Sequence, residues 1–112
     1  TNQMRRTIGA ALAVAIIAVP AAAAPRPPLP PHHALWLRVA QCEQPGNGYG
    51  GVNWQHRGPR YEGGLGFYYG SWDAYKPKGY PDNAGDATWR QQMNVANRLW
   101  ARAGWGWGCD KR

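Results

Sequence analysis

Glu43 stands apart from the other residues of this chain that could take part in proton transfer. The sequence holds only six Asp and Glu, and this one follows Cys42 at the end of an aromatic-rich segment. A carboxylic acid that protonates the leaving oxygen of a glycosidic bond must stay neutral near neutral pH, which an apolar niche favours. Trp36, Trp54 and Tyr61 could wall such a niche. We predict that Glu43 is a general acid; the alternative is a solvated glutamate at a helix end.

Glu62 is the candidate for a second carboxylate. Enzymes that cut glycosidic bonds commonly use two carboxyl groups, and the separation between them sets the stereochemical outcome. Glu62 lies on a stretch that should face Glu43 across a hairpin. Asp73 is the other choice, although an acidic residue in the first turn of a helix already has a structural reason to be there. If Glu62 has no catalytic role, we expect an exposed hairpin residue.

The chain is rich in aromatic residues, with seven Trp and six Tyr. Sugar rings present apolar C–H faces that stack on aromatic rings, and their hydroxyls bind Asn and Gln side chains. This combination of residue types occurs at Asn53-Trp54-Gln55 and Tyr68-Tyr69, whereas Trp89 and Trp100 are expected in the core. Aromatic residues interleaved with arginine would also suit single-stranded nucleic acid, but the export predicted below argues against that partner.

Other reaction classes have little support in the sequence. His32, His33 and His56 lack the spacing or the cysteine set of a metal site. The glycines of residues 46–51 are not followed by the Gly-Lys-Ser/Thr of a phosphate-binding loop. We expect no metal and no cofactor.

Residues 4–24 have the pattern of a secretory signal peptide. A basic start at Arg5 and Arg6 precedes an apolar run from Ile8 to Val19, and Ala22-Ala23-Ala24 offers a cleavage site. The run is about a dozen residues long, short of the roughly 20 that span a bilayer. We predict cleavage near Ala24 and a secreted or cell-wall location without stable membrane insertion. The alternative is an uncleaved anchor.

Cys42 and Cys109 are the only cysteines, and export would place them in an oxidising compartment. A small domain buries a modest fraction of its surface and often needs a covalent crosslink. A bond between these two residues closes a loop of about 65 residues, which in the chain-entropy model stabilises the fold by roughly 4 kcal/mol. We predict this disulfide; the alternative is two free thiols.

Residues 25–33 are a predicted proline-rich linker to one small domain, residues 34–112. Five of the seven residues from Pro25 to Pro31 are proline, so we expect an extended, semi-rigid spacer, with recognition by a partner as the alternative.

After Ala24, 11 Lys and Arg stand against six Asp and Glu, a net charge near +5. Such a surface attracts polyanions generally, and for an exported protein the cell wall is the nearest.

Two segments must position Glu43. A helix is predicted from about Ala34 to Gln44 because apolar residues recur at helical spacing, and Pro45-Gly46 ends it. The glycine-rich stretch from Asn47 to Gly66 predicts an irregular hairpin with a tight turn near Arg57 to Arg60.

Two more helices are expected. The first runs from Ser71, its N-cap, to Lys76. The last has the capping box of Thr88 and Gln91 at its start and Gly104 at its end. Its apolar stripe recurs at steps of four and three and consists of Trp89, Met93, Ala96, Trp100 and Ala103. The sequence therefore predicts an α+β domain, mostly helical, with a short β-hairpin and one disulfide.

Three blocks resemble the resuscitation-promoting factor, or transglycosylase-like, domain family of actinobacteria and their phages. The first block is Leu35-Trp36-Leu37-Arg38-Val39-Ala40-Gln41-Cys42-Glu43, similar to the family's W-x-x-V-A-x-C-E-x-G-G-x-W. The second is Tyr61-Glu62-Gly63-Gly64-Leu65-Gly66-Phe67 with Trp72 and Tyr75, similar to Y-Y-G-G-L-Q-F-x-x-x-x-W-x-x-Y. The third, Gln91-Gln92-Met93-Asn94-Val95-Ala96 with Gly104-Trp105 and Cys109, is similar to Q-Q-x-x-V-A and G-W…C.

The resemblance implies a lysozyme-like fold, a Cys42–Cys109 disulfide and Glu43 as the single catalytic acid acting on peptidoglycan. The bond cut would be the β-1,4 link from N-acetylmuramic acid to N-acetylglucosamine, and either water or the sugar's own 6-hydroxyl would capture the oxocarbenium-like centre. Substrate-binding residues are expected at Trp54, Tyr61, Gly64, Tyr68 and Trp72. We expect a monomer that remodels cell wall or supports regrowth of dormant cells, with other cell-wall hydrolases as partners. A glycan-binding or signalling module that does not cut is the alternative.

The chain departs from the family's pattern at four places. Extra glycines after Gln44-Pro45-Gly46 lengthen the loop that follows Glu43 by several residues. The family's N-T-G turn becomes His56-Arg57-Gly58, and the Gln of G-G-L-Q-F becomes Gly66. These three departures lie where substrate is expected. The fourth is Glu62, which replaces the second Tyr of the Y-Y pair and adds a carboxylate.

Overall fold

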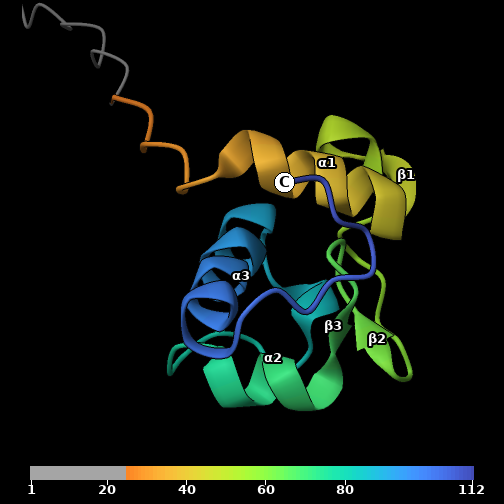
Figure 1. Ribbon diagram of the computed structural model, residues 1–112, viewed down its shortest axis with the longest axis vertical. Helices are drawn as coiled ribbons and strands as arrows, with labels where there is room; N and C mark the ends of the chain where they lie inside the picture. The colour runs from red at the N-terminus through yellow and green to blue at the C-terminus, as the bar shows by residue number, and fades with distance from the viewer. Residues whose placement is uncertain (1–24) are drawn as a thin grey trace, which may run out of the picture.

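The computed structural model describes residues 25–112, and within that range it contains three α-helices and one short two-stranded sheet (Figure 1). The predicted signal peptide lies outside the described residues. The elements in chain order are α1 (His33–Glu43), β1 (Pro45–Gly48), the 3₁₀ turn η2 (Tyr49–Gly51), β2 (Tyr61–Glu62), β3 (Phe67–Tyr68), α2 (Tyr69–Tyr75), the 3₁₀ turn η3 (Ala84–Asp86) and α3 (Trp89–Ala103).

The helices surround a small core, with the strands at one side. Figure 1 shows α1 and α2 at opposite ends of the domain, with α3 between them on one side and β2 and β3 on the other. Both α1 and α2 contact α3. The two strands pair antiparallel, with Tyr61 opposite Tyr68 and Glu62 opposite Phe67. The predicted α+β fold class is confirmed, and the arrangement fits a lysozyme-like fold.

The first and last helices form as predicted. α1 buries Trp36, Val39 and Ala40 completely and ends at Glu43, one residue before the predicted end. α3 begins at a capping box in which Thr88 accepts from the Gln91 backbone and the Gln91 side chain accepts from the Thr88 backbone. It ends at a glycine with φ +87°, a conformation that favours this residue type. Along its predicted stripe, Met93 and Ala96 are fully buried, Trp89 and Trp100 are half-buried and Ala103 is exposed.

The hairpin turn and the start of α2 differ from the prediction. The turn between β2 and β3 spans residues 63–66 rather than Arg57 to Arg60, because Gly63 (φ +74°) and Gly66 (φ +61°) take left-handed conformations that let the chain reverse there. The predicted N-cap of α2, Ser71, lies inside the helix. α2 follows β3 without a loop and therefore begins at Tyr69, with no side-chain cap.

A buried glutamine ties α3 to the hairpin side of the domain. The Gln92 side chain is fully buried on α3. Its Nε2 donates to the carbonyls of Trp54 (2.9 Å) and Ala87 (3.0 Å), and its Oε1 accepts from the backbone N–H of Gly64 (2.8 Å). All its polar atoms have partners, so the burial costs little and the hairpin is fixed relative to the helix.

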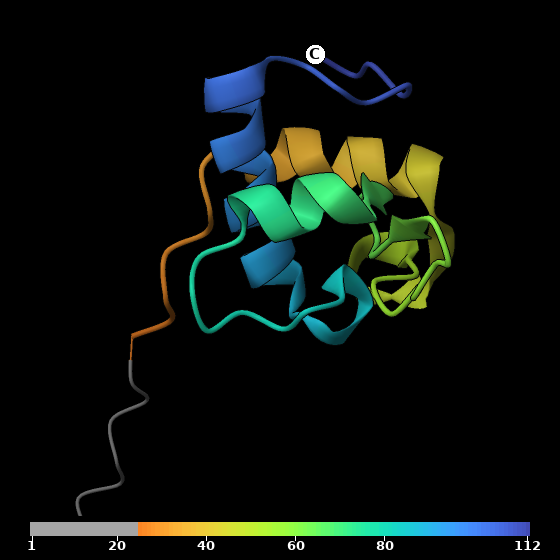
Figure 2. The same cartoon turned by 90° about the horizontal axis from the view of Figure 1, so that it is seen from below.

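The proline-rich segment is attached to the domain at its C-terminal end. It forms neither helix nor strand from Pro25 to Pro30, and Figure 2 shows it running beside α3. Arg90 donates to the carbonyl of Pro28 (2.8 Å) and Asn97 to that of Pro31 (2.9 Å). The part of the predicted spacer next to α1 is therefore packed against α3.

Candidate active site

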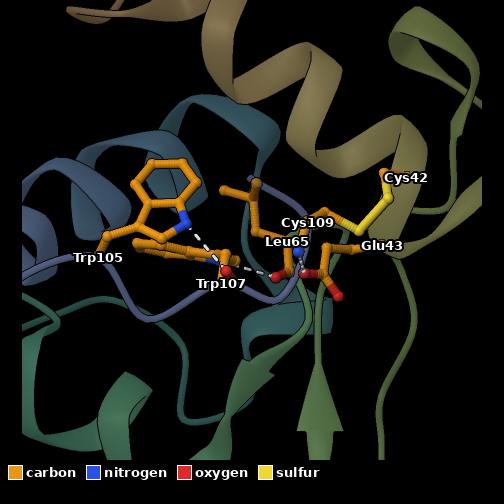
Figure 3. The surroundings of a disulfide bond; sticks show 6 residues. All are labelled: Cys42, Glu43, Leu65, Trp105, Trp107 and Cys109. Carbon is orange, nitrogen blue, oxygen red and sulfur yellow. Dashed lines mark hydrogen bonds between the residues drawn. A yellow bond between two sulfur atoms is a disulfide. The ribbon is translucent and has the colours of Figure 1, made fainter. Parts of the chain in front are cut away.

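Glu43 is the last residue of α1, and a disulfide fixes the turn that carries it. Cys42 is bonded to Cys109, with the two Cα atoms 6.1 Å apart, so the predicted disulfide is confirmed. Figure 3 shows the Glu43 carboxylate beside the backbone of Cys109, whose N–H donates to Oε2 over 3.2 Å. The crosslink therefore brings a backbone donor from the far end of the chain to this carboxylate.

The tail that carries Cys109 is held in place by two indole groups. The indole N–H of Trp107 donates to the carbonyl of Leu65 on the hairpin turn (3.0 Å). The indole N–H of Trp105 donates to the carbonyl of Trp107 (2.9 Å) and its ring stacks on Trp36 at 5.4 Å between centroids. These contacts anchor the tail to both the hairpin and α1.

Arg112 makes two further contacts that hold the end of the tail. The guanidinium of Arg112 lies 4.7 Å from the ring centre of Trp105 and also binds the Asp110 carboxylate. Hydrogen bonds from Arg112 lower the pKa of Asp110 to about 2. This ion pair is therefore present at neutral pH.

A cleft lies between the hairpin and the tail, and Glu43 lines it. Its volume is about 560 Å³, within the ~300–1,000 Å³ range of small-molecule sites. Tyr61 and Tyr68 present aromatic rings to it and are 52% and 43% exposed. The remaining lining residues are Gln44, Gly66, Phe67, Ser71, Leu99, Ala103, Gly104, Gly106, Trp107 and Gly108. The cleft thus combines one carboxylate with exposed aromatic rings and small residues.

Gly66 leaves space next to the carboxylate. A Cβ at this position would lie 3.4 Å from Oε1 of Glu43. The φ of +61° also disfavours any residue with a side chain. The Oε2 atom is occupied by the Cys109 N–H, so the side of the carboxyl group nearer Gly66 is the one left free for a ligand.

Residues 31–109 match the family model described as a transglycosylase-like domain. The chain belongs to this family. The resemblance seen in its three sequence blocks is therefore confirmed.

Two curated relatives of this transglycosylase-like domain come from Corynebacterium glutamicum. The chain is 39% identical to resuscitation-promoting factor Rpf1 over 107 residues, which are 95% of this chain and 49% of that protein. It is 33% identical to resuscitation-promoting factor Rpf2 over 75 residues, which are 66% of this chain and 18% of that protein. The chain thus spans about half the length of the first relative and less of the second.

The transglycosylase-like domain brings together only part of the predicted site. Tyr61 and Tyr68 lie with Glu43 in the cleft. Trp72 does not line it: the side chain is fully buried, packs on Phe67 and donates to the carbonyl of Pro81 (2.9 Å), so no sugar can reach it. Trp36, proposed as a wall of the acid's niche, is likewise fully buried in the core.

Trp54 and Gly64 also lie outside the cleft. Trp54 is 6% exposed and lines a second cavity. Gly64 packs directly beneath it, where a Cβ would collide with the Trp54 ring and Val52. The absence of a Cβ at Gly64 therefore allows this close packing, and its backbone N–H bonds Gln92.

Glu62 is separate from Glu43. Successive residues of a strand point to opposite faces, so Tyr61 faces the cleft and Glu62 faces inward. The Glu62 side chain is buried, and its Oε1 accepts from the backbone N–H of Ala84 in η3 (3.0 Å). Neither sequence expectation fits, because this glutamate is not an exposed residue and does not line the cleft. Asp73 is exposed on α2 and does not line it either.

The tail forms a wall of the site, which the prediction from sequence does not include. Gly104, Gly106 and Gly108 line the cleft, as do Ser71 and Leu99. The sequence holds one indication of this wall, since Glu43 follows a cysteine predicted to form a disulfide. The residues next to the partner cysteine must then lie close to the acid. For Ser71 the sequence predicts a helix cap instead, yet the residue lies within α2 and lines the cleft.

Within residues 25–112, no group of three or more His, Cys, Asp or Glu is placed to hold a metal ion. Among the same residues, no helix has the length and apolar character needed to cross a membrane.

Proposed function

We propose that this chain is a secreted enzyme that cleaves the glycan strands of peptidoglycan, with Glu43 as the general acid. The observation that carries the proposal is that this carboxylate is the only acidic group lining the cleft, which two exposed tyrosines also line. Membership of the transglycosylase-like family supports it, as do two relatives named resuscitation-promoting factors.

In the proposed reaction Glu43 protonates the oxygen that leaves when the β-1,4 bond between N-acetylmuramic acid and N-acetylglucosamine breaks. The N–H of Cys109 bonds Oε2, which must act there as an acceptor. The acidic proton is therefore assigned to Oε1, the atom that borders the open space at Gly66. Tyr61 and Tyr68, which pair across the hairpin with their ring centroids 6.4 Å apart, offer aromatic surface on which sugar rings can stack.

The oxocarbenium-like centre must be captured by something other than a second carboxylate. None of the residues that line the cleft besides Glu43 is acidic, and Glu62 is engaged with Ala84. A covalent intermediate on a protein carboxylate is thus unsupported by this geometry. Water or the 6-hydroxyl of the muramic acid residue is the acceptor, and the products distinguish the two because only the second yields a 1,6-anhydro end.

A second candidate is a wall-binding or signalling module that keeps the fold without cutting. Gly66 favours this alternative, because it replaces a glutamine of the family's pattern next to the acid. Such a module would bind peptidoglycan equally well with or without the Glu43 carboxyl group and would release nothing from it.

The test is incubation of purified peptidoglycan with the chain and with its Glu43→Gln variant, followed by sedimentation and mass spectrometry of the supernatant. We expect soluble fragments from the unaltered chain only, with both proteins bound to the pellet. Equal release by both proteins would rule out Glu43 as the acid. Release by neither, with binding retained, would favour the non-catalytic module.

Export and partners complete the proposal. A signal peptide over residues 4–24, cut near Ala24, would deliver a monomer to the cell wall, with residues 25–33 as a linker and 34–112 as the catalytic domain. Other wall hydrolases are candidate partners, and wall remodelling or regrowth of dormant cells is the proposed role. N-terminal sequencing of the exported protein checks the cleavage site.

A further inference from the structure

A second cavity, the loop groove, lies outside the cleft and shares no lining residue with it. Its volume is about 560 Å³, the same as that of the cleft. Gln44 lines the cleft and the next residue, Pro45, lines the groove, so the two sites adjoin along the chain. The groove is lined by Pro45, Gly46, Asn47, Gly48, Tyr49, Val52, Asn53, Trp54, Gln55 and Trp89. Most of these belong to the long loop after Glu43, the first departure from the family's pattern.

The loop that forms the groove is held by its own tyrosine. The Tyr49 ring stacks on Trp89 of α3, with centroids 4.2 Å apart and 9° between the planes. Its hydroxyl bonds Nε2 of His33 on α1 (2.9 Å), and its carbonyl accepts from the indole N–H of Trp54 (2.8 Å). Side chains from three different parts of the fold therefore hold one residue of the loop.

Backbone contacts hold the rest of the loop. The N–H of Asn53 donates to the carbonyl of Gln44 (2.8 Å), and the side chain of Gln41 donates to the carbonyl of Gly50 (2.8 Å). A Cβ on Gly46 would lie 2.7 Å from the Cβ of Asn53, so only glycine fits this approach. The groove is thus preformed, and a ligand would not have to order the loop on binding.

The lining of the groove is polar but uncharged. Asn47, Asn53 and Gln55 expose carboxamide groups, and Tyr49 is 43% exposed. The side chains of Asn47 and Gln55 have no hydrogen-bond partner among residues 25–112, so both can bind a ligand. Carboxamides beside the exposed ring of Tyr49 suit the hydroxyl and acetamido groups and the C–H faces of a neutral saccharide. A polyanion would find no cation among the lining residues.

We propose that the loop groove is a second saccharide site, which binds N-acetylhexosamine residues of peptidoglycan outside the cleft. This inference rests on the proposed function, since it takes the same polymer as ligand. The groove would bind wall glycan outside the cleft and so keep the protein attached to polymeric peptidoglycan.

The test is an NMR titration of the ¹⁵N-labelled chain bearing Glu43→Gln with N-acetylglucosamine hexasaccharide. The indole N–H signals of Trp54 and Trp89 report on the groove, and that of Trp107 reports on the cleft. We expect shifts at both sites. When Asn47→Ala and Gln55→Ala are added to this chain, the affinity measured at the groove signals should fall roughly tenfold, because two hydrogen bonds are lost. Asn94→Ala, an exposed carboxamide outside both cavities, is the matched control and should change neither site.

Several results would overturn the proposal. Shifts confined to Trp107, or groove affinity unchanged by the Asn47→Ala/Gln55→Ala pair, would show that the groove binds no sugar. Shifts at Trp54 and Trp89 with poly(glycerol phosphate) but not with the hexasaccharide would assign the groove to an anionic wall polymer. Failure of the proposed function would give a different result. The Glu43→Gln variant would then cut the hexasaccharide or purified peptidoglycan, whether or not the groove signals shift.

Discussion

The backbone N–H of Cys109 donates to Oε2 of Glu43 over 3.2 Å, although 66 residues separate the two in the chain. The disulfide from the neighbouring Cys42 makes this contact possible, since it joins the end of α1 to the tail. One crosslink therefore stabilises the fold, positions one wall of the cleft and orients the carboxyl group.

Removal of the crosslink should affect both stability and cleavage. We expect the Cys42→Ser/Cys109→Ser pair to lose about 2–5 kcal/mol of unfolding free energy, measured by urea denaturation. Cleavage of peptidoglycan should fall further than the folded fraction accounts for, because the Cys109 N–H no longer holds Oε2. Reductant should reproduce both losses in the unaltered chain and do nothing to the double variant. Full activity of the folded double variant would contradict this link.

Glu62 should be needed for stability and not for proton transfer. Glu62→Gln keeps an oxygen that can accept from the Ala84 N–H, so activity should be largely retained. Glu62→Leu leaves that buried N–H without a partner and should cost about 1–3 kcal/mol in unfolding free energy, with activity per folded molecule maintained. Loss of cleavage in a stable Glu62→Gln variant would assign this carboxylate a catalytic part.

Gln92 should be among the most sensitive polar residues. Gln92→Leu leaves the Gly64 N–H and the carbonyls of Trp54 and Ala87 unbonded in the core, and we expect a loss of about 3 kcal/mol on urea denaturation. Amide hydrogen exchange at Gly64 should accelerate. Gln91→Ala, which removes only one half of the capping box, is the control and should cost about 1 kcal/mol or less. Equal effects of the two changes would contradict the assigned role.

Gly66 and Gly106 offer a matched pair within the cleft. Gly66→Ala places a Cβ at φ +61° and 3.4 Å from Oε1 of Glu43, so we expect about 1–2 kcal/mol of destabilisation and slower cleavage. A Cβ on Gly106 would meet no atom within 4 Å, so Gly106→Ala should change neither property appreciably. Thermal unfolding and release of soluble wall fragments measure the two effects. Identical behaviour of the two variants would count against the position assigned to Gly66.

Local signals in the sequence were sufficient for α1, α3 and the disulfide. The capping box of Thr88 and Gln91 depends only on residues within one helix turn, so it can be predicted without knowledge of the tertiary fold. The turn of the hairpin was misplaced because glycines occur throughout residues 46–66, and only packing decides which of them reverse the chain.

The candidate site could be predicted only in part. Tyr61 and Glu62 are neighbours in a two-residue strand, so their side chains point to opposite faces, one to the cleft and one to the core. A shift of the strand by one residue would exchange them, and the sequence alone does not fix that register. Trp54 and Trp72 have the composition of a sugar site, yet both side chains are buried. Residue type cannot separate a stacking platform from a core aromatic, since both roles use the same apolar ring.

The most direct test of the account is the initial rate at which the purified chain and its Glu43→Gln variant release soluble fragments from peptidoglycan. A positioned general acid contributes about 10²–10⁴-fold to a rate. We therefore predict at least a ~100-fold lower rate for Glu43→Gln, with unchanged thermal stability and unchanged binding to the wall. A Glu43→Gln variant that cuts as fast as the unaltered chain would contradict the account.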